Sequence, residues 1–286
     1  MSAQKVGTVA LETIALGRSY PRRDPKDPEY ALDGLNLRLC GGEAVVLAGG
    51  NGAGKSTALR LIAGLEMPDR GRVRIFGRSP RSMVARRRTG YLPDQSELFP
   101  FLDWRETLDF FAAISDVARP EAKRRADAWG ERFGLTDYGR KRVRAFSMGM
   151  RRRLGLAAVL MSEPELLLLD EPISGLDPEG MRLFNEVMAE QKARGTALLL
   201  SSHHLGQAET FCDRIVALRR GKVVSEGRIA DLGQTLGAHD FTVSGLDQEG
   251  LEALMARAEE LGAELSSPRV AESALEDLLV RGDDEA

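Results

Sequence analysis

The chain has 286 residues, of which 43% are hydrophobic and 29% charged, enough apolar sequence for one large or two average domains. Its net charge of −3 indicates no particular partner, and two cysteines are too few for a disulfide framework or a metal cluster. No stretch approaches the ~18 uncharged apolar residues of a membrane span, and residues 1–20 hold no apolar run long enough for a signal peptide. We therefore expect a soluble, cytosolic protein that serves a membrane, if at all, as a peripheral subunit.

The net charge hides an uneven distribution. Residues 231–286 hold 14 Asp and Glu against three Arg, a net charge of −11, so residues 1–230 carry +8. A basic body is compatible with phosphate, nucleic acid or anionic lipid as a partner. The acidic segment also begins a new pattern, first strand-like and then helical. We predict a small α+β accessory domain at 231–286, after a larger domain at 1–230.

Short apolar runs bounded by glycine alternate with helical patterns along the larger domain. Strands are predicted at 8–13, 43–48, 72–77, 166–169, 197–201 and 215–218. Helices are predicted at 55–65, 102–133, 148–162, 179–193 and 204–212, and a Pro-rich, charged loop at 21–30. Strands that alternate with helices indicate an α/β fold with a parallel sheet.

The segment Gly-Gly-Asn-Gly-Ala-Gly-Lys-Ser at 49–56 follows a predicted strand and opens a predicted helix. It fits the pattern G-x-x-x-x-G-K-[ST], in which backbone N–H groups and a helix N-terminus surround phosphate oxygens. Lys55 is expected to reach the β- and γ-phosphates, and the Ser56 hydroxyl to bind Mg²⁺. A glycine-rich turn without a ligand is the alternative, and the flanking strand and helix disfavour it.

Two adjacent carboxylates, Asp170 and Glu171, follow the apolar run Leu166–Leu169. A continuous apolar run of this length is typical of a fully buried parallel strand, and ligands bind at the carboxyl ends of such strands. Asp170 suits Mg²⁺, and Glu171 suits the general base that polarises an attacking water.

A third stretch, Phe-Ser-Met-Gly-Met at 146–150, lies between these two motifs, and Pro-Ile-Ser-Gly-Leu-Asp at 172–177 and Ser-Ser-His at 201–203 follow them. In this order the motifs resemble the nucleotide-binding domain of ABC transporters over about residues 8–230. The resemblance implies a P-loop fold with a parallel-sheet core, an antiparallel β-subdomain and a helical subdomain at about 96–155.

The resemblance also implies the functional residues. ATP binding falls to Gly49, Gly50, Asn51, Gly52, Ala53, Gly54, Lys55, Ser56 and Thr57, with Ser147, Gly149 and Asp177 contributing across a dimer interface. Catalysis falls to Glu171 and His203, and Mg²⁺ binding to Ser56 and Asp170. Tyr20 lies where the family stacks an aromatic ring on adenine, and Tyr30 is its rival because the 21–30 loop is long.

The chain departs from the family pattern where a glutamine normally follows the proline after a strand. Here Asp94 holds that place and Gln95 comes next. Asp94 could ligate Mg²⁺ itself, a one-residue shift could let Gln95 serve, or Asp94 could be a solvated loop acid. Two smaller departures are Gly50 for the usual proline and methionines at 148 and 150 of the signature segment.

The resemblance implies an ATPase that dimerises head to tail around two ATP molecules, as a homodimer at the cytoplasmic face of the cell membrane. Its partner would be a separate permease of the export type, meeting the aromatic segment Phe99–Trp104, although those rings could instead fill the subdomain's own core. The arginines at 86–88 and 151–153 are predicted to be solvated. The alternative is a non-transport ABC ATPase on ribosomes or DNA, and no nucleic acid is expected because no coiled coil interrupts the single cassette. A P-loop kinase is disfavoured because it has no use for the signature segment.

Overall fold

The computed structural model describes residues 7–20, 30–95, 98–202, 210–229 and 231. The chain divides into two compact units, Met1–Ile229 and Ala230–Ala286. Apart from Asp231, the second unit lies outside the described residues, so the accessory α+β domain stays a prediction. Within the described part, no helix combines the length and the apolar character needed to cross a membrane.

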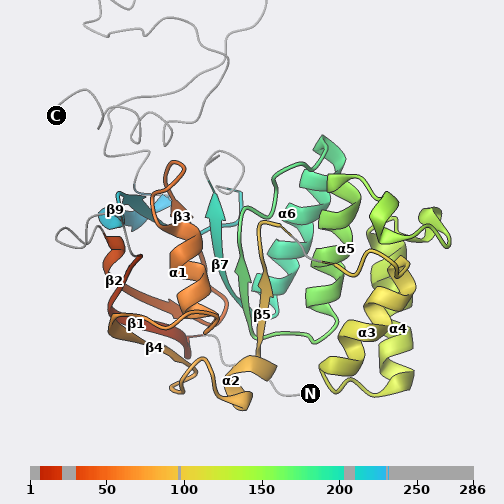
Figure 1. Ribbon diagram of the computed structural model, residues 1–286, viewed down its shortest axis with the longest axis horizontal. Coiled ribbons are helices and arrows are strands. Elements are labelled where there is room, and N and C mark those ends of the chain that lie inside the picture. Colours follow the sequence, from red (N-terminus) through yellow and green to blue (C-terminus); the bar gives the residue numbers. More distant parts are fainter. Residues whose placement is uncertain (1–6, 21–29, 96–97, 203–209, 230, 232–286) are drawn as a thin grey trace, which may run out of the picture. The chain divides into compact units, whose positions relative to one another are not determined.

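A six-stranded sheet forms the centre of the first unit, in the order β5-β6-β7-β3-β8-β9 (Figure 1). Its strands are β3 Ala44–Ala48, β5 Thr89–Leu92, β6 Leu166–Leu169, β7 Ala197–Ser202, β8 Arg214–Arg219 and β9 Lys222–Arg228. All neighbouring pairs are parallel except β8 and β9. Every residue of β3, β6 and β7 is buried, as expected for strands covered on both faces.

A second, three-stranded antiparallel sheet has the order β2-β1-β4. Its strands are β1 Val9–Ser19, β2 Tyr30–Cys40 and β4 Arg70–Ile75. One face buries alternate apolar side chains against α1, Lys55–Ile62, in a shared core, while the other carries exposed arginines of β4. This alternation is the usual pattern of an antiparallel sheet with one solvated face.

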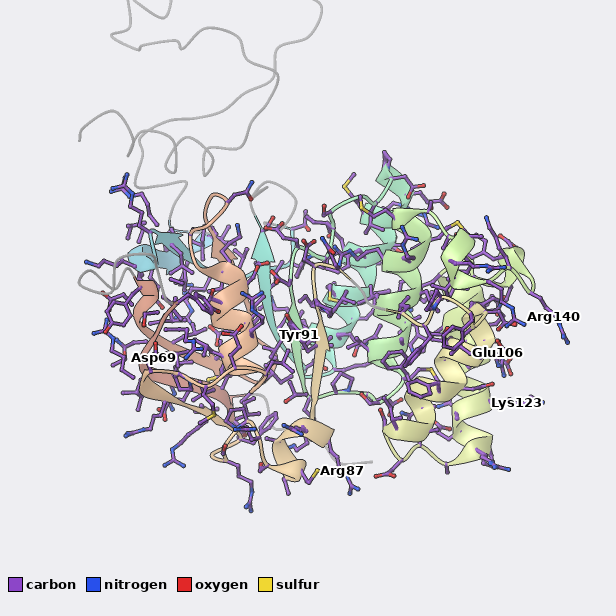
Figure 2. The ribbon with its side chains drawn as sticks, in the orientation of Figure 1. Asp69, Arg87, Tyr91, Glu106, Lys123 and Arg140 are labelled. Carbon is purple, nitrogen blue, oxygen red and sulfur yellow. The ribbon has the colours of Figure 1, made fainter. Side chains whose placement is uncertain are left out.

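The remaining helices are α2 Met83–Arg87, α3 Trp104–Ile114, α4 Arg119–Arg132, α5 Met148–Leu160 and α6 Pro178–Ala193. Helices α3, α4 and α5 pack together, and they lie on the opposite side of the parallel strands from the antiparallel sheet (Figure 1). Figure 2 places Asp69 on the antiparallel-sheet side, Tyr91 on β5 in the middle, and Glu106 and Lys123 on the helical side. The predicted fold class, with its parallel core, β-subdomain and helical subdomain, is confirmed.

The single helical pattern predicted for 102–133 is two helices. Asp103 caps α3 by accepting a hydrogen bond from Glu106 N, and the Glu106 side chain accepts one from Asp103 N. The chain leaves the helix at Asp116, whose φ of 57° is left-handed, and α4 starts again with Pro120 in its first turn. Apolar periodicity continues across the break, which is why the sequence pattern did not show it.

Three strands and one short helix were not predicted. β2 contains Asp33 and Gly34, β5 has only four residues, and β9 is a strand of mixed polar and apolar residues whose side chains are almost all exposed. The turn at Arg220 and Gly221, both with positive φ, pairs β9 with β8. The predicted helix at 204–212 and loop at 21–30 fall largely outside the described residues, although Tyr30 itself begins β2.

Candidate functional site

The glycine-rich segment lies between β3 and α1 and owes its shape to two close backbone approaches. Gly49 and Gly54 have φ of 152° and 105°. A Cβ at Gly49 would collide with the carbonyl oxygen of Leu218, and one at Gly54 with that of Ala31. Only glycine fits both positions, so the backbone N–H groups of this loop are held in the curved arrangement that phosphate requires. At Gly50, by contrast, a Cβ would meet nothing within 4 Å.

Lys55, the first residue of α1, is 6% exposed and is surrounded by acceptors. Its Nζ donates to the carbonyl oxygens of Gly49 at 2.5 Å and Gly50 at 3.3 Å. It also lies 3.3 Å from Glu171 Oε1. The lysine therefore joins the glycine-rich loop to the carboxylate pair.

The carboxylates predicted after β6 lie beside α1 and the end of β7. Ser56 Oγ donates to Asp170 Oδ1 at 3.1 Å, and Ser201 Oγ donates to the same oxygen at 2.6 Å. Ser201 Oγ also accepts from Glu171 N at 2.9 Å. Asp170 is 3% exposed and forms no ion pair within the described residues. Among the described residues the side chain of this buried carboxylate accepts hydrogen bonds from two hydroxyls alone, which fits a site for a cation with oxygen ligands, such as Mg²⁺.

Ser201 was noted in the sequence only as part of the Ser-Ser-His motif, and its bridging role was missed. The signal is the sheet register, in which Leu169 of β6 pairs with Leu200 of β7. The next residues of both strands therefore lie side by side. Glu171 adopts a φ of 45°, an unusual conformation for a non-glycine residue that often accompanies functional sites. His203 lies outside the described residues.

Tyr91, on β5, carries a half-buried phenol. Burial, and secondarily the negative charge of Asp170, raise the pKa of Tyr91 to about 12. The phenol therefore stays protonated at neutral pH. It can donate a hydrogen bond but cannot serve as a base.

Asp94 and Gln95 follow β5, and both are exposed. The Asp94 carboxylate does not stand free in solvent, because Arg152 Nη2 donates to its Oδ1 at 3.1 Å. Arg152 is 4% exposed, so the prediction of a solvated arginine is wrong at this position. Arg88 is partly solvated, because its 36% exposed side chain pairs with Glu165 and stacks on Phe76.

The signature segment begins α5. Ser147 is the N-cap and accepts a hydrogen bond from Met150 N at 3.2 Å. A Cβ on Gly149 would lie 3.0 Å from the carbonyl oxygen of Gly175, so this glycine allows the segment to approach the loop after Asp170 closely. Asp177, in the same loop, caps α6 and accepts from Arg153 Nη2 at 2.7 Å. This ion pair and the Gly180 N–H hold the pKa of Asp177 below its usual value.

The two tyrosines proposed for adenine lie at the paired ends of β1 and β2, where Ser19 faces Tyr30. Tyr20 donates its hydroxyl hydrogen bond to Glu66 at 2.5 Å and is 37% exposed. The ring of Tyr30 is covered by the guanidinium of Arg70 at 4.0 Å. The assignment of Tyr20, or of its rival Tyr30, to the adenine ring stays a prediction.

The aromatic residues of segment 99–104 were expected either to form a docking surface or to fill the core of the helical subdomain, and the structure divides them between the two. Trp104 is 9% exposed, and a Cβ on Gly130 would lie 2.5 Å from its ring, so it belongs to the helical core. Phe99 and Phe101 are 39% and 65% exposed. Their rings lie 6.0 Å apart, and Phe99 lies 4.9 Å from the partly exposed Phe110 of α3.

Comparison with known proteins identifies the family. The family described as ABC transporter matches residues 32–174. The daunorubicin resistance ATP-binding protein DrrA3 of Streptomyces coeruleorubidus is 40% identical over 215 residues, 74% of this chain and 68% of that protein. The Nod factor export ATP-binding protein I of Paraburkholderia xenovorans (strain LB400) is 34% identical over 220 residues, 76% of this chain and 70% of that protein.

Among solved structures, that of an ATP-binding subunit of an ABC transporter aligns with a TM-score of 0.72 and 31% identity. The alignment covers 86% of this chain and 99% of the solved chain. Fold, motif order and relatives agree. The chain belongs to the ABC transporter family as an ATP-binding subunit, and it is an ATPase.

Proposed function

We propose that this chain is the ATPase subunit of an exporter, which dimerises head to tail around two ATP molecules and drives a separate transmembrane permease. The observation that carries the proposal is the division of the motifs. Lys55, Asp170 and Glu171 form one connected group, whereas Ser147 begins a different helix. Within the described residues, no hydrogen bond or ion pair links Ser147 to this group. A second copy would bring its signature segment to the phosphates.

In this proposal Lys55 exchanges its backbone acceptors for the β- and γ-phosphate oxygens, which carry more negative charge than the carbonyls of Gly49 and Gly50. The exchange weakens the contact between Lys55 and Glu171, now 3.3 Å. Glu171 would then orient a water and accept its proton, while Ser201 Oγ accepts a hydrogen bond from Glu171 N and holds that backbone in place.

Ser56 and Asp170 would hold Mg²⁺, because their oxygens already share one contact at 3.1 Å and Asp170 is buried. Bound Mg²⁺ would neutralise charge on the phosphoryl oxygens as the bond to the leaving group breaks. Ser147, Gly149 and Asp177 of the second protomer would complete the site. We assign Tyr20 to adenine and His203 to the γ-phosphate as expectations from the family pattern.

The permease would dock on the exposed aromatic cluster of Phe99, Phe101 and Phe110. Exposed aromatic side chains are frequent anchors of protein interfaces. Bound there, the chain would lie at the cytoplasmic face of the cell membrane as a peripheral subunit. The names of the relatives, which refer to drug resistance and Nod factor export, support export rather than import.

The experiment compares affinity-tagged wild-type chain with Phe101→Asp in detergent-solubilised membranes of the producing cell. We expect a multi-span membrane protein to co-purify with the wild type and to be lost with the variant, while Mg²⁺-dependent ATP hydrolysis persists in both. Phe110→Asp tests the same surface from α3. Recovery of ribosomal subunits or DNA instead, unaffected by either variant, would support the non-transport alternative.

A further inference from the structure

Arg152 is a buried cation that contacts the loop after β5, and the family pattern assigned it no role. It is 4% exposed, although its helix neighbours Arg151 and Arg153 are partly exposed. A guanidinium in such surroundings is costly unless charge and hydrogen bonds compensate it. Its partners therefore indicate what it is for.

Two of those partners belong to one loop. Arg152 Nη1 donates to the carbonyl oxygen of Pro93 at 2.9 Å, and Nη2 donates to Asp94 Oδ1 at 3.1 Å. The planar fork of arginine suits such a double contact, which a lysine cannot reproduce with the same geometry. The loop that follows β5 is thus bound through backbone and side chain together.

Arg152 also interacts electrostatically with the carboxylates Asp170 and Glu171. Burial lowers the pKa of its guanidinium, whereas the charges of Asp94, Asp170 and Glu171 act in the opposite direction. One buried cation therefore lies within electrostatic reach of all three acids. Its charge offsets part of the repulsion among them.

The helix that carries Arg152 is the signature helix α5, whose N-cap is Ser147. Arg152 lies five positions after Ser147, about 7.5 Å along the helix axis. The next residue, Arg153, pairs with Asp177 in the loop after Asp170. Consecutive arginines thus bind α5 to the loop after β5 and to the loop after β6.

We propose that Arg152 is a positioning residue for ATP hydrolysis, which binds Pro93 and Asp94 to α5 so that the loop after β5 and the signature segment move as one unit. This inference rests on the proposed dimeric hydrolysis site. It gives Asp94 a role that none of the three sequence-based interpretations contained, because Asp94 Oδ1 accepts a hydrogen bond from the buried Arg152. The departure from the family pattern at residue 94 then has a physical reason, since a carboxylate matches the buried guanidinium.

The test uses the full chain with Arg152→Gln, Asp94→Asn and the double variant. Arg151→Gln is the matched control, because within the described residues the Arg151 side chain makes no hydrogen bond or ion pair. In the nucleotide-free protein, amide hydrogen exchange at residues 90–95 should rise about tenfold or more in both single variants. It should stay at the wild-type value in Arg151→Gln.

The same proteins are then compared in steady-state ATP hydrolysis. For Arg152→Gln and Asp94→Asn, kcat should fall by roughly tenfold, with KM for ATP and the half-saturating Mg²⁺ concentration within about twofold of wild type. The double variant should lose no more than either single variant, because the pair acts as a unit. Arg152→Lys, which keeps the charge but not the fork, should recover part of kcat.

Unchanged exchange at residues 90–95, additive losses in the double variant, or an undiminished kcat in folded Arg152→Gln would each overturn the inference. A raised Mg²⁺ requirement confined to Asp94→Asn would overturn it in favour of Asp94 as a metal ligand. If Arg152→Gln does not fold, Asp94→Asn decides in the same measurements, because Asp94 is 52% exposed. Failure of the proposed function would instead appear as a wild-type chain without ATP-dependent dimerisation.

Discussion

Replacement of Gly54 by alanine should damage the fold and the phosphate loop together. Its φ of 105° lies in the left-handed region, which costs alanine roughly 1–2 kcal/mol. The added Cβ would overlap the carbonyl oxygen of Ala31, and neither backbone can move without disturbing β2 or α1. Overpacking of this kind costs about 1–3 kcal/mol. The free energy of unfolding should therefore fall by about 2–5 kcal/mol.

Gly50→Ala is the matched control, because its Cβ would meet nothing within 4 Å. A surface change of this type alters stability by about 0.5 kcal/mol or less. Thermal unfolding of the nucleotide-free chain, followed by circular dichroism, should show a Tm lower by roughly 5–15 °C for Gly54→Ala and nearly unchanged for Gly50→Ala. ATP hydrolysis should be lost only in the first. Equal Tm values for the two variants would refute the conclusion that the contact with Ala31 requires glycine at position 54.

Three further predictions concern the core, the carboxylate pair and pH. Trp104→Ala should lower the free energy of unfolding by about 3–5 kcal/mol in urea titrations. Phe101→Ala, which changes a 65% exposed residue, should alter it by less than about 0.5 kcal/mol. Equal losses would contradict the division of the aromatic segment into a buried and an exposed part. Ser201→Ala should cost about 1–3 kcal/mol, because Glu171 N loses its acceptor, and an unchanged Tm would argue against this bridge. The pKa of Tyr91 is raised to about 12 in the folded chain, so above about pH 10 the unfolded chain loses this proton first and the free energy of unfolding falls. Between about pH 9 and 11 the urea midpoint of Tyr91→Phe should therefore fall less steeply than that of the wild type. Parallel declines of the two midpoints would contradict the effect.

Much of the fold was predictable because buried strands appear in the sequence as short continuous runs of apolar residues. The four leucines of β6 are all fully buried, and their continuous run correctly placed the acids Asp170 and Glu171 at the end of a central strand. The glycine-lysine pattern placed the P-loop for a similar reason, since two of its glycines are fixed by steric contact. The leucine run and the glycine-lysine motif are each contiguous in sequence, so both can be recognised locally, although the two glycines contact the distant residues Ala31 and Leu218.

The unpredicted parts depend on distant neighbours. β9 has an exposed sequence without apolar alternation and becomes a strand because β8 offers it hydrogen-bonding partners. Arg152 is one of three consecutive arginines, and only one of them can face the core at helical spacing. Which one does so depends on Asp94, which lies 58 residues earlier in the chain. Ser201 likewise acquires its bridging role from the register of β7 against β6.

Dimerisation around ATP is tested most directly with Glu171→Gln, which keeps the size of the side chain and removes the proposed base. With ATP and Mg²⁺, light scattering coupled to gel filtration should give about twice the chain's 31.3 kDa for this variant. Without nucleotide it should give the mass of one chain, and ATP turnover should fall by about 10²–10⁴-fold. Adding Ser147→Arg should abolish the dimer without abolishing ATP binding. A variant that stays monomeric with ATP, or that hydrolyses ATP at the wild-type rate, would contradict the proposed mechanism.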